Sequence, residues 1–199
     1  MIKVDIEQGT DEWKSLRCGL PSASKFSEII TTSGDRSKSV TKYIYTLAGE
    51  SISGQRQEIF QSQAMLRGVE LEPEARAMYE FMKDVDVEQV GFCFMNEDRK
   101  FGCSPDGLVG DDGMLEIKVP LVHTHIDYLF KGKMPTTYFQ QVQGQMYVCD
   151  RKWCDFMSYS PSLKPFLIRV YRDDEFIEKL AVELEYMCSQ IEEVIKKIK

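Results

Sequence analysis

The chain has 199 residues, of which 43% are hydrophobic and 29% are charged, and its formal net charge is −7. This length suits one folded domain, and a composition without Pro/Gly-rich tracts or charge blocks excludes a disordered or collagen-like protein. The longest apolar runs, such as residues 92–95, fall far short of the ~20 residues of a membrane-spanning helix. We therefore expect a single soluble, cytoplasmic domain over residues 1–199, with no membrane partner.

The negative net charge also limits how the protein could bind nucleic acid. A sequence-independent DNA coat needs many Lys and Arg contacts to phosphate, whereas this chain has 25 Lys and Arg against 32 Asp and Glu. An enzyme acting on DNA is not excluded, because its carboxylates can bind metal ions while its basic residues line one channel. The composition disfavours a passive coat and leaves a nuclease open.

Cysteine and histidine content limits the metal chemistry. The six cysteines are scattered and form no CxxC pair, so we expect reduced core thiols rather than disulfides. The histidines are His123 and His125, and these do not supply a recognisable His/Cys zinc site. Any metal ion is therefore expected on carboxylates.

The apolar periodicity divides the chain into a helical part over about 10–85, a sheet core over about 87–172 and a C-terminal helix over about 174–198. In the first part, Thr10 is expected to cap a short helix and a second helix follows Ser22. Longer helices are expected over 40–53 and about 57–82. Because proline disfavours helical backbone in the residue before it, Pro73 is expected to kink or break the last of these.

The sheet core is recognised by short runs of Val, Phe, Ile and Leu between turn residues. Strands are expected over 87–95, 100–110, 114–120, 153–160 and 166–172, and helices over 121–130 and 138–148. The sequence Gly-Asp-Asp-Gly at 110–113 predicts a hairpin turn, with Asp112 and Gly113 suited to positive φ. The closing helix is the clearest element, because its apolar residues recur every three or four positions. The two strands on either side of residues 110–113 are therefore expected to form a central antiparallel hairpin.

This hairpin carries the part of the sequence with the most chemistry. Asp106 lies before the turn, in Ser-Pro-Asp-Gly, and Glu116-Ile117-Lys118 lies after it. Side chains alternate along a strand, so Glu116 and Lys118 share one face while Ile117 points into the opposite layer. Pairing through the turn brings Asp106 beside Glu116. Two carboxylates and an ammonium group are therefore expected to converge.

Such a group suits the hydrolysis of a phosphodiester. The carboxylates can hold Mg²⁺, which stabilises the charge that develops on the phosphoryl group, while Lys118 orients or deprotonates the attacking water. The alternative is a surface hairpin on which Glu116 and Lys118 form a weak solvated ion pair, because so short a motif also arises by chance. The motif alone leaves both interpretations open.

Further blocks of sequence favour the nuclease. They run in order over almost the whole chain: Gln8-Gly9-Thr10-Asp11-Glu12-Trp13 with Leu16-Arg17 and Gly19; Ser22-Ala23-Ser24; Arg67-Gly68 through Glu70 to Ala75-Arg76; Ser104-Pro105-Asp106-Gly107; Glu116-Ile117-Lys118; and Gln141-Val142-Gln143 with Tyr147. In these blocks the sequence resembles the PD-(D/E)xK nucleases, and specifically the phage lambda-type alkaline exonucleases, also described as YqaJ-like viral recombinases.

The resemblance implies an α/β (α+β) fold, with a central mixed β-sheet flanked by helices and a restriction-endonuclease-like core. It implies degradation of one strand of linear double-stranded DNA from its 5′ end, dependent on Mg²⁺ with Mn²⁺ as a substitute, which leaves a 3′ overhang for recombination by strand annealing. It also implies a ring-shaped homotrimer that acts on DNA ends, with a single-strand annealing protein as partner, in a phage or prophage setting.

The resemblance also assigns roles to single residues. Asp106 and Glu116 are expected to ligate the metal ion. The main-chain carbonyl of Ile117 is expected to be a further ligand, and the helix carboxylate of Glu70 completes the metal site directly or through a water. Lys118 positions the attacking water. A pocket for the terminal 5′-phosphate is expected from Arg17, Ser24, Ser104 and Gln143. A guanidinium can bind a phosphate with two parallel hydrogen bonds, and hydroxyl and amide donors bind its remaining oxygens.

Two other readings of the same core stay open. An endonuclease or a RecB/Cas4-like nuclease would share it, but a Cas4-like iron–sulfur cluster needs closely grouped cysteines, and Cys149, Cys154 and Cys188 are widely spaced. A non-catalytic DNA-end-binding recombination protein would be expected to have lost a motif carboxylate or the lysine. The motif here is intact.

Overall fold

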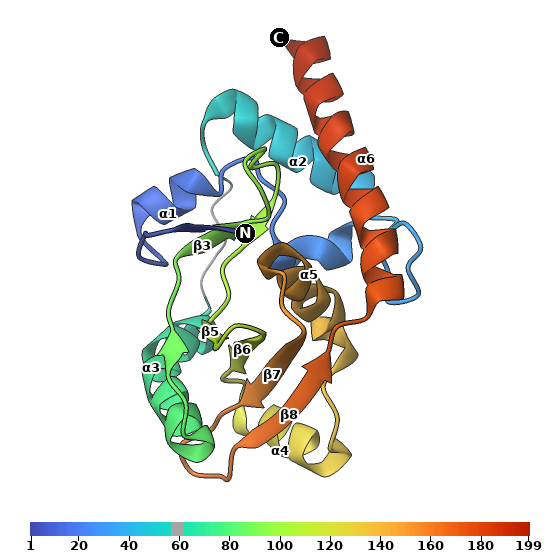
Figure 1. The fold of residues 1–199 in the computed structure, drawn as a ribbon. Helices are drawn as coiled ribbons and strands as arrows, with labels where there is room; N and C mark the ends of the chain where they lie inside the picture. The colour runs from blue at the N-terminus through green and yellow to red at the C-terminus, as the bar shows by residue number, and fades with distance from the viewer. Residues whose placement is uncertain (57–61) are drawn as a thin grey trace.

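In the computed structural model, which describes residues 1–56 and 62–199, the chain forms two β-sheets with helices around them (Figure 1). The larger sheet has the order β2-β5-β6-β7-β8, formed by β2 (Val87–Glu88), β5 (Gly107–Val109), β6 (Gly113–Lys118), β7 (Trp153–Ser158) and β8 (Phe166–Tyr171). β6 and β7 run parallel, whereas the other neighbours run antiparallel. The mixed sheet that the sequence predicted is confirmed.

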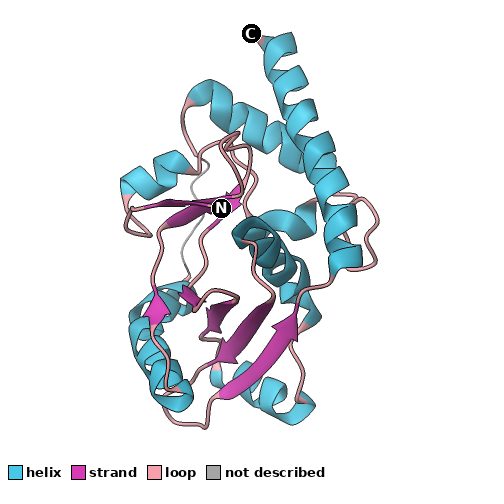
Figure 2. Cartoon of the chain, viewed as in Figure 1, coloured by secondary structure: helices cyan, strands magenta, loops and turns pink. Residues whose placement is uncertain are grey.

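The smaller sheet is antiparallel and has the order β1-β3-β4, formed by β1 (Ile2–Val4), β3 (Phe92–Phe94) and β4 (Gly102–Cys103). The continuous strands predicted over 87–95 and 100–110 are therefore wrong, because each segment is divided between the two sheets (Figure 2). The first division falls near Gly91, where a Cβ atom would lie 1.7 Å from the carbonyl oxygen of Ile6. The second falls at residues 104–106, which places the predicted catalytic aspartate between the sheets.

The helices, in chain order, are α1 (Asp11–Leu16), the 3₁₀ helix η1 (Ala23–Glu28), α2 (Val40–Ser53), α3 (Gln63–Lys83), α4 (Val122–Lys131), the 3₁₀ helix η2 (Thr136–Tyr138), α5 (Phe139–Cys149) and α6 (Asp174–Ile198). The predictions for α2, α4, α5 and α6 are confirmed to within a residue or two. The helix expected after Ser22 is a 3₁₀ helix.

Helix α3 was predicted over about 57–82, of which residues 57–61 lie outside the described residues. It begins after Ser62, whose hydroxyl accepts a hydrogen bond from the amide of Met65 at 3.3 Å. The expected break at Pro73 does not occur, and α3 continues to Lys83. Ala75 and Tyr79, on the far side of the proline, are buried against the larger sheet, and this packing holds the helix together.

Alternate residues of β6 face two different layers. Leu115 and Ile117 lie in the apolar cluster with Tyr79 of α3, whereas Met114 lies in the cluster that includes α5 and α6. Glu116 follows Met114 by two positions and therefore faces α5. The predicted alternation, with Ile117 opposite Glu116 and Lys118, is confirmed.

The turn between β5 and β6 differs from the prediction in its backbone. Val109 pairs with Gly113, so the turn comprises residues 110–112, and the positive φ of 55° belongs to Gly110 rather than to Asp112 or Gly113. Gly113 is required by packing rather than by its φ angle. A Cβ atom there would lie 2.1 Å from the Trp153 ring of the neighbouring strand, so a larger residue would clash with this ring.

Two broader expectations can be compared with the structure. All six cysteines fall within the described residues; each is free, and all except Cys18 are buried, which confirms the core thiols. Across residues 1–56 and 62–199, no helix combines the length and hydropathy needed to cross a bilayer.

Candidate active site

Strand pairing brings the three motif side chains together at one end of the β5–β6 hairpin. Asp106 lies just before β5, and its Oδ2 accepts a hydrogen bond from the main-chain N–H of Ile117 at 2.6 Å. Glu116 is 1% exposed, and its Oε1 forms an ion pair with Lys118 Nζ. The convergence expected from the sequence is therefore present.

Two amides of α5 hold the Glu116 carboxylate from the other side. Gln141 Nε2 donates to Oε1 at 2.5 Å, and Gln145 Nε2 donates to Oε2 at 2.8 Å. The two glutamines are four positions apart and therefore share one face of the helix. The carboxylate is thus fixed by donors on both oxygens, an arrangement that the motif alone did not predict.

The electrostatics of the site favour a cation. Burial and the adjacent charge of Glu116 raise the pKa of Asp106 well above its usual range, with Glu72 adding to the rise and Lys118 opposing it. Burial lowers the pKa of Lys118, but the carboxylates of Glu116 and Asp106 outweigh it and raise that pKa. One lysine faces several acidic groups, so a bound cation would relieve their repulsion.

The donors suit a hard divalent metal ion. Within residues 1–56 and 62–199, no three His, Cys, Asp or Glu side chains gather into a ready-made metal cluster. Asp106, Glu116 and the carbonyl of Ile117 can supply oxygen ligands, with water in the remaining positions, as Mg²⁺ characteristically accepts. The observation that supports this fit is the repulsion between the carboxylates of the half-buried Asp106 and the buried Glu116.

The helix carboxylate beside this site is Glu72 rather than Glu70. Glu70 is exposed, and no described contact joins it to Asp106 or Glu116. Glu72 is half-buried, raises the pKa of Asp106, and pairs with Arg76, whose Nε donates to the carbonyl of Asp106 at 3.2 Å. The signal was present in the sequence, because Glu72 shares the helix face of Arg76 and of the buried Tyr79, at positions i, i+4 and i+7.

A small cleft adjoins the carboxylates. It has a volume of about 150 Å³ and is lined by Gln8, Trp13, Arg17, Ser22, Ala23, Ser24, Ser104, Gln141 and Gln145. Three of the four residues predicted to bind the terminal phosphate, Arg17, Ser24 and Ser104, are therefore brought together.

Arg17 is the charged group of this cleft and is 8% exposed. Its guanidinium lies 4.0 Å from the centroid of the Trp13 ring and donates to the hydroxyls of Ser22 at 3.1 Å and Ser24 at 3.4 Å. Burial, followed by the positive charge of Arg56, lowers the pKa of Arg17 to about 10. Its buried Nε has no hydrogen-bond partner among the described residues. A buried guanidinium with an unused donor suits an anion.

Ser104 joins the cleft to the loop before the motif aspartate. Its hydroxyl donates to the carbonyl of Gly91 and accepts from Trp13 Nε1, both at 2.9 Å. The indole nitrogen also donates to Gly91, at 3.1 Å. Trp13 therefore anchors this wall of the cleft and carries Arg17 on its ring face.

The fourth predicted phosphate residue, Gln143, lies elsewhere. It is 1% exposed; its Nε2 donates to the carbonyl of Tyr171 at 3.0 Å, and its Oε1 accepts from the amide of Asp173 at 2.9 Å. These bonds hold the junction between β8 and α6. Positions 141 and 143 are about 200° apart on a helix, so Gln143 points away from the cleft. The cleft amide comes from Gln141 or Gln145 instead.

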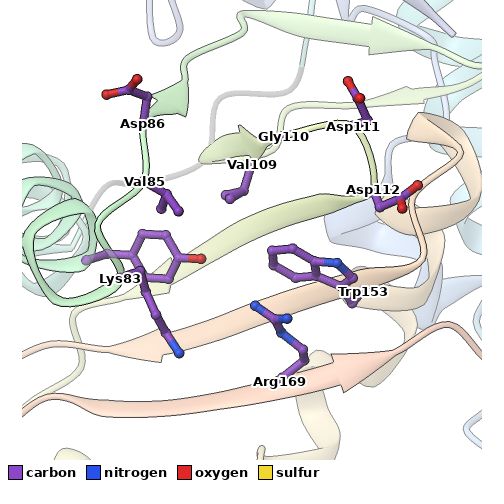
Figure 3. A pocket seen from close by; sticks show the side chains of 10 residues that line it. Lys83, Val85, Asp86, Val109, Gly110, Asp111, Asp112, Trp153 and Arg169 are labelled. Carbon is purple, nitrogen blue, oxygen red and sulfur yellow. The ribbon is translucent and has the colours of Figure 1, made fainter.

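A larger cavity, of about 710 Å³, lies at the hairpin-turn end of the same sheet (Figure 3). Arg169 stacks at 3.5 Å on the Trp153 ring there and forms a two-bond ion pair with the buried Asp155. Lys83, Asp86 and the turn aspartates complete the lining. None of the predicted site residues lines this cavity, and its buried charge is already paired.

The mixed sheet, with the half-buried Asp106, the buried Glu116 and an adjoining lysine, defines a nuclease-like core. A family model for the YqaJ-like viral recombinase domain matches residues 12–152, and the chain belongs to this family. The resemblance inferred from the sequence blocks is confirmed.

Solved structures agree with this assignment. An alkaline exonuclease from Laribacter hongkongensis, LHK-Exo, is 36% identical and superposes with a TM-score of 0.86, covering 95% of this chain and 96% of that one. Its complex with dAMP is equally similar, with 96% of each chain covered. A phage related exonuclease from Haemophilus somnus 129PT is 14% identical, with a TM-score of 0.71 over 90% of this chain and 96% of that one, and shares the fold. No curated protein matches the chain.

Proposed function

We propose that this chain is a metal-dependent exonuclease that degrades one strand of linear double-stranded DNA from its 5′ end and leaves a 3′ overhang for recombination by strand annealing. The supporting observation is the junction of two sites. Gln141 and Gln145 line the cleft of Arg17 and also hold Glu116. A terminal phosphate on Arg17 would therefore lie beside the catalytic carboxylates.

Mg²⁺ is the proposed cofactor, with Mn²⁺ as a substitute. Asp106, Glu116 and the carbonyl of Ile117 would hold it, with Glu72 in place of Glu70 as the nearby helix carboxylate. When bound, the metal ion stabilises the charge that develops on the phosphoryl group and favours deprotonation of water. Lys118, whose raised pKa keeps it protonated, donates a hydrogen bond that orients the attacking water.

The cleft gives the enzyme its preference for an end. Arg17 neutralises a terminal phosphate, and the hydroxyls of Ser24 and Ser104 border the same space. An internal linkage carries one charge less than a terminal monophosphate and continues into a second nucleotide. DNA ends are therefore the proposed substrate. A homotrimer and a single-strand annealing protein that acts on the exposed 3′ strand are the proposed partners.

The proposal is tested by digesting linear duplexes with a 5′-phosphate or a 5′-hydroxyl, in Mg²⁺ or Ca²⁺, and resolving products to the nucleotide. We expect mononucleotides released from phosphorylated 5′ ends in Mg²⁺, little release in Ca²⁺, and intact closed circles. Cleavage of closed circles would support an endonuclease, and end binding without cleavage in either metal would support the non-catalytic reading.

The lysine provides a second test of the same reaction. Lys118→Ala should abolish cleavage but leave end binding largely in place, because its proposed role concerns the water and not the grip on DNA. Binding is measured by fluorescence anisotropy on an end-labelled duplex in Ca²⁺. Turnover within tenfold of the wild type would rule out the role assigned to Lys118.

A further inference from the structure

Two of the residues that line the cleft have a buried polar atom without a hydrogen-bond partner among the described residues. These atoms are Nε of Arg17 and Oε1 of Gln145. Buried polar atoms in folded proteins almost always have a partner, so each exception calls for an explanation. The proposed terminal phosphate accounts for Arg17, because a phosphate oxygen is an acceptor. It does not account for Gln145, because a carbonyl oxygen is also an acceptor.

The missing partner of Gln145 is therefore a hydrogen-bond donor or a cation, and it lies close to Glu116. Gln145 is 1% exposed, and its Nε2 donates to Glu116 Oε2 at 2.8 Å. Oε1 and Nε2 sit on the same carbon, so the orphaned oxygen lies close to the Glu116 carboxylate. In a hydrolytic site, water is the small donor that suits such a place, and a metal ion on the same oxygen is the alternative that the Mn²⁺ titration below tests.

We propose that Gln145 is a catalytic residue that holds the hydrolytic water, with Oε1 accepting a hydrogen bond from it while Nε2 fixes the Glu116 carboxylate alongside. The inference rests on the proposed nuclease function. In the reaction the water oxygen forms a bond to phosphorus, and the bond from phosphorus to the 3′-oxygen of the released nucleotide breaks. The water gives up a proton and the leaving oxygen gains one, so no further reactant is needed.

The geometry gives the water complementary neighbours. Lys118 Nζ, on the Oε1 side of Glu116, is a donor, and Gln145 Oε1, on the Oε2 side, is an acceptor. A water held between one donor and one acceptor is fixed in orientation, which is what an attack on a bound phosphoryl group requires. Gln141 also donates to Glu116, but its own amide oxygen is not among the buried atoms that lack a partner, so the same argument does not extend to it.

The experiment compares Gln145→Met with Gln143→Met. Both glutamines are 1% exposed and lie on α5, but Gln143 is bonded to Tyr171 and Asp173 away from the cleft. Each variant is assayed for kcat and KM on 5′-phosphorylated duplex, for Mn²⁺ affinity by calorimetry and for thermal stability. Gln145→Met should lower kcat about 10- to 100-fold and weaken Mn²⁺ binding about tenfold, with KM for ends within about threefold. Gln143→Met should lower the melting temperature and leave kcat and Mn²⁺ affinity near wild type.

Other results would overturn the inference. If saturating Mn²⁺ restores the turnover of Gln145→Met, then Gln145 acts on Glu116 alone and holds no water. A kcat within threefold of the wild type has the same consequence. Should Gln145→Met fail to fold, Gln145→Asn keeps a polar amide but withdraws it by one methylene, and the same losses are expected. A wild type inactive on every duplex would overturn the proposed nuclease, whereas the Mn²⁺ titration would still report whether Gln145 holds Glu116, and an unchanged affinity would refute that part.

Discussion

At the scale of residues, the direction of a carboxylate on α3 decides whether it can act on the site. Glu70 and Glu72 are two positions apart, about 200° around the helix, so they cannot face the same neighbour. Glu72 is the carboxylate whose negative charge raises the pKa of Asp106. It also pairs with Arg76, which donates a hydrogen bond to the carbonyl of Asp106. Glu70 and Glu72 have the same side chain but face different sides of α3, so they form a matched pair for mutation.

We predict that Glu72→Gln lowers Mn²⁺ affinity and cleavage by about tenfold or more, because it removes a negative charge beside the metal ligands and disturbs the Arg76 contact to the Asp106 carbonyl. Glu70→Gln should leave both within about twofold. Calorimetry and steady-state rates on the same duplex measure the pair. The reverse pattern would restore Glu70 to the role that the sequence motif suggested.

Arg17 is expected to lower the stability of the folded protein while it enables binding of the terminal phosphate. The fall of its pKa to about 10 corresponds to a penalty on the order of 3 kcal/mol for the buried protonated guanidinium. Because the folded state disfavours the proton, the penalty is fully present at pH 7 and begins to decrease as the pH rises above the folded pKa of about 10, toward the ordinary pKa of arginine. We predict that Arg17→Met raises the free energy of unfolding at pH 7 by about 1–3 kcal/mol, and that this gain shrinks above pH 10.

The same variant should lose its preference for phosphorylated ends. Losing a charge-assisted contact to the terminal phosphate costs about 1.5–3 kcal/mol, so cleavage of 5′-phosphorylated duplex should fall roughly 10- to 100-fold, with little change on 5′-hydroxyl ends. Paired time courses on the two substrates, beside urea unfolding curves, measure both effects. Equal slowing of both substrates would make Arg17 a general channel residue.

The motif residues could be predicted from the sequence where strand geometry fixes direction, and not where a helix does. Asp106, Glu116 and Lys118 lie on or beside one hairpin, whose period of two residues leaves no ambiguity about the shared face. The resemblance assigns Glu70 and Gln143 by matching sequence blocks on helices, where a step of two residues reverses the face. Gln145 lay outside the motif match, and its contact with Glu116 needed the packing of α5 on the sheet.

At the scale of elements, the packing of α5 against η1 builds the cleft, since α5 carries the amides and η1 with its N-cap carries Ser22 and Ser24. Gly144 makes this contact, because a Cβ atom there would lie 2.3 Å from the ring of the fully buried Phe26. Alanine normally stabilises a helix interior relative to glycine by about 1 kcal/mol. At this position the clash with an immobile ring outweighs that gain.

We predict that Gly144→Ala lowers the free energy of unfolding by about 1–3 kcal/mol, as overpacked cores do, and also weakens the preference for 5′-phosphorylated ends. The control is Gly49→Ala in α2, where nothing lies within 4 Å of the added atom, and a gain of about 0.5–1 kcal/mol is expected. Urea unfolding measures both variants. A stable Gly144→Ala with unchanged selectivity would show that η1 shifts without cost to the cleft.

Long elements were predictable and short ones were not, for a physical reason. The apolar repeat of α6 extends over many turns, so local pattern alone specifies it. β1 to β4 have two or three residues each, too few for a period, and their membership of one sheet or the other is decided by pairing across the chain. Pro73 shows the same effect, since burial of Ala75 and Tyr79 overrides its local preference.

At the scale of the whole molecule, an exonuclease with a net charge of −7 needs a means of staying on a polyanion. Long-range attraction is weak for such a protein and is screened within ~10 Å at 0.1 M salt. Large apolar side chains are exposed on separate elements, with Phe81 of α3 at 86% and Phe130 of α4 at 92%. Separate apolar patches on one chain suit a head-to-tail contact, which closes into a ring when the rotation allows it.

The resemblance to the alkaline exonucleases implies three copies, so we predict a closed homotrimer that encircles the DNA, with a mass by light scattering of about three times the 23.0 kDa of one chain. Enclosure makes retention topological, so the number of nucleotides removed per encounter should change little between about 50 and 200 mM salt. The initial capture of an end depends on phosphate contacts and should weaken steeply over the same range. Single-encounter digestion with a trap of unlabelled duplex separates these quantities. A monomer at micromolar concentration that keeps its processivity would contradict the ring, and processivity that falls in step with capture would mean that charge, and not enclosure, holds the enzyme on its substrate.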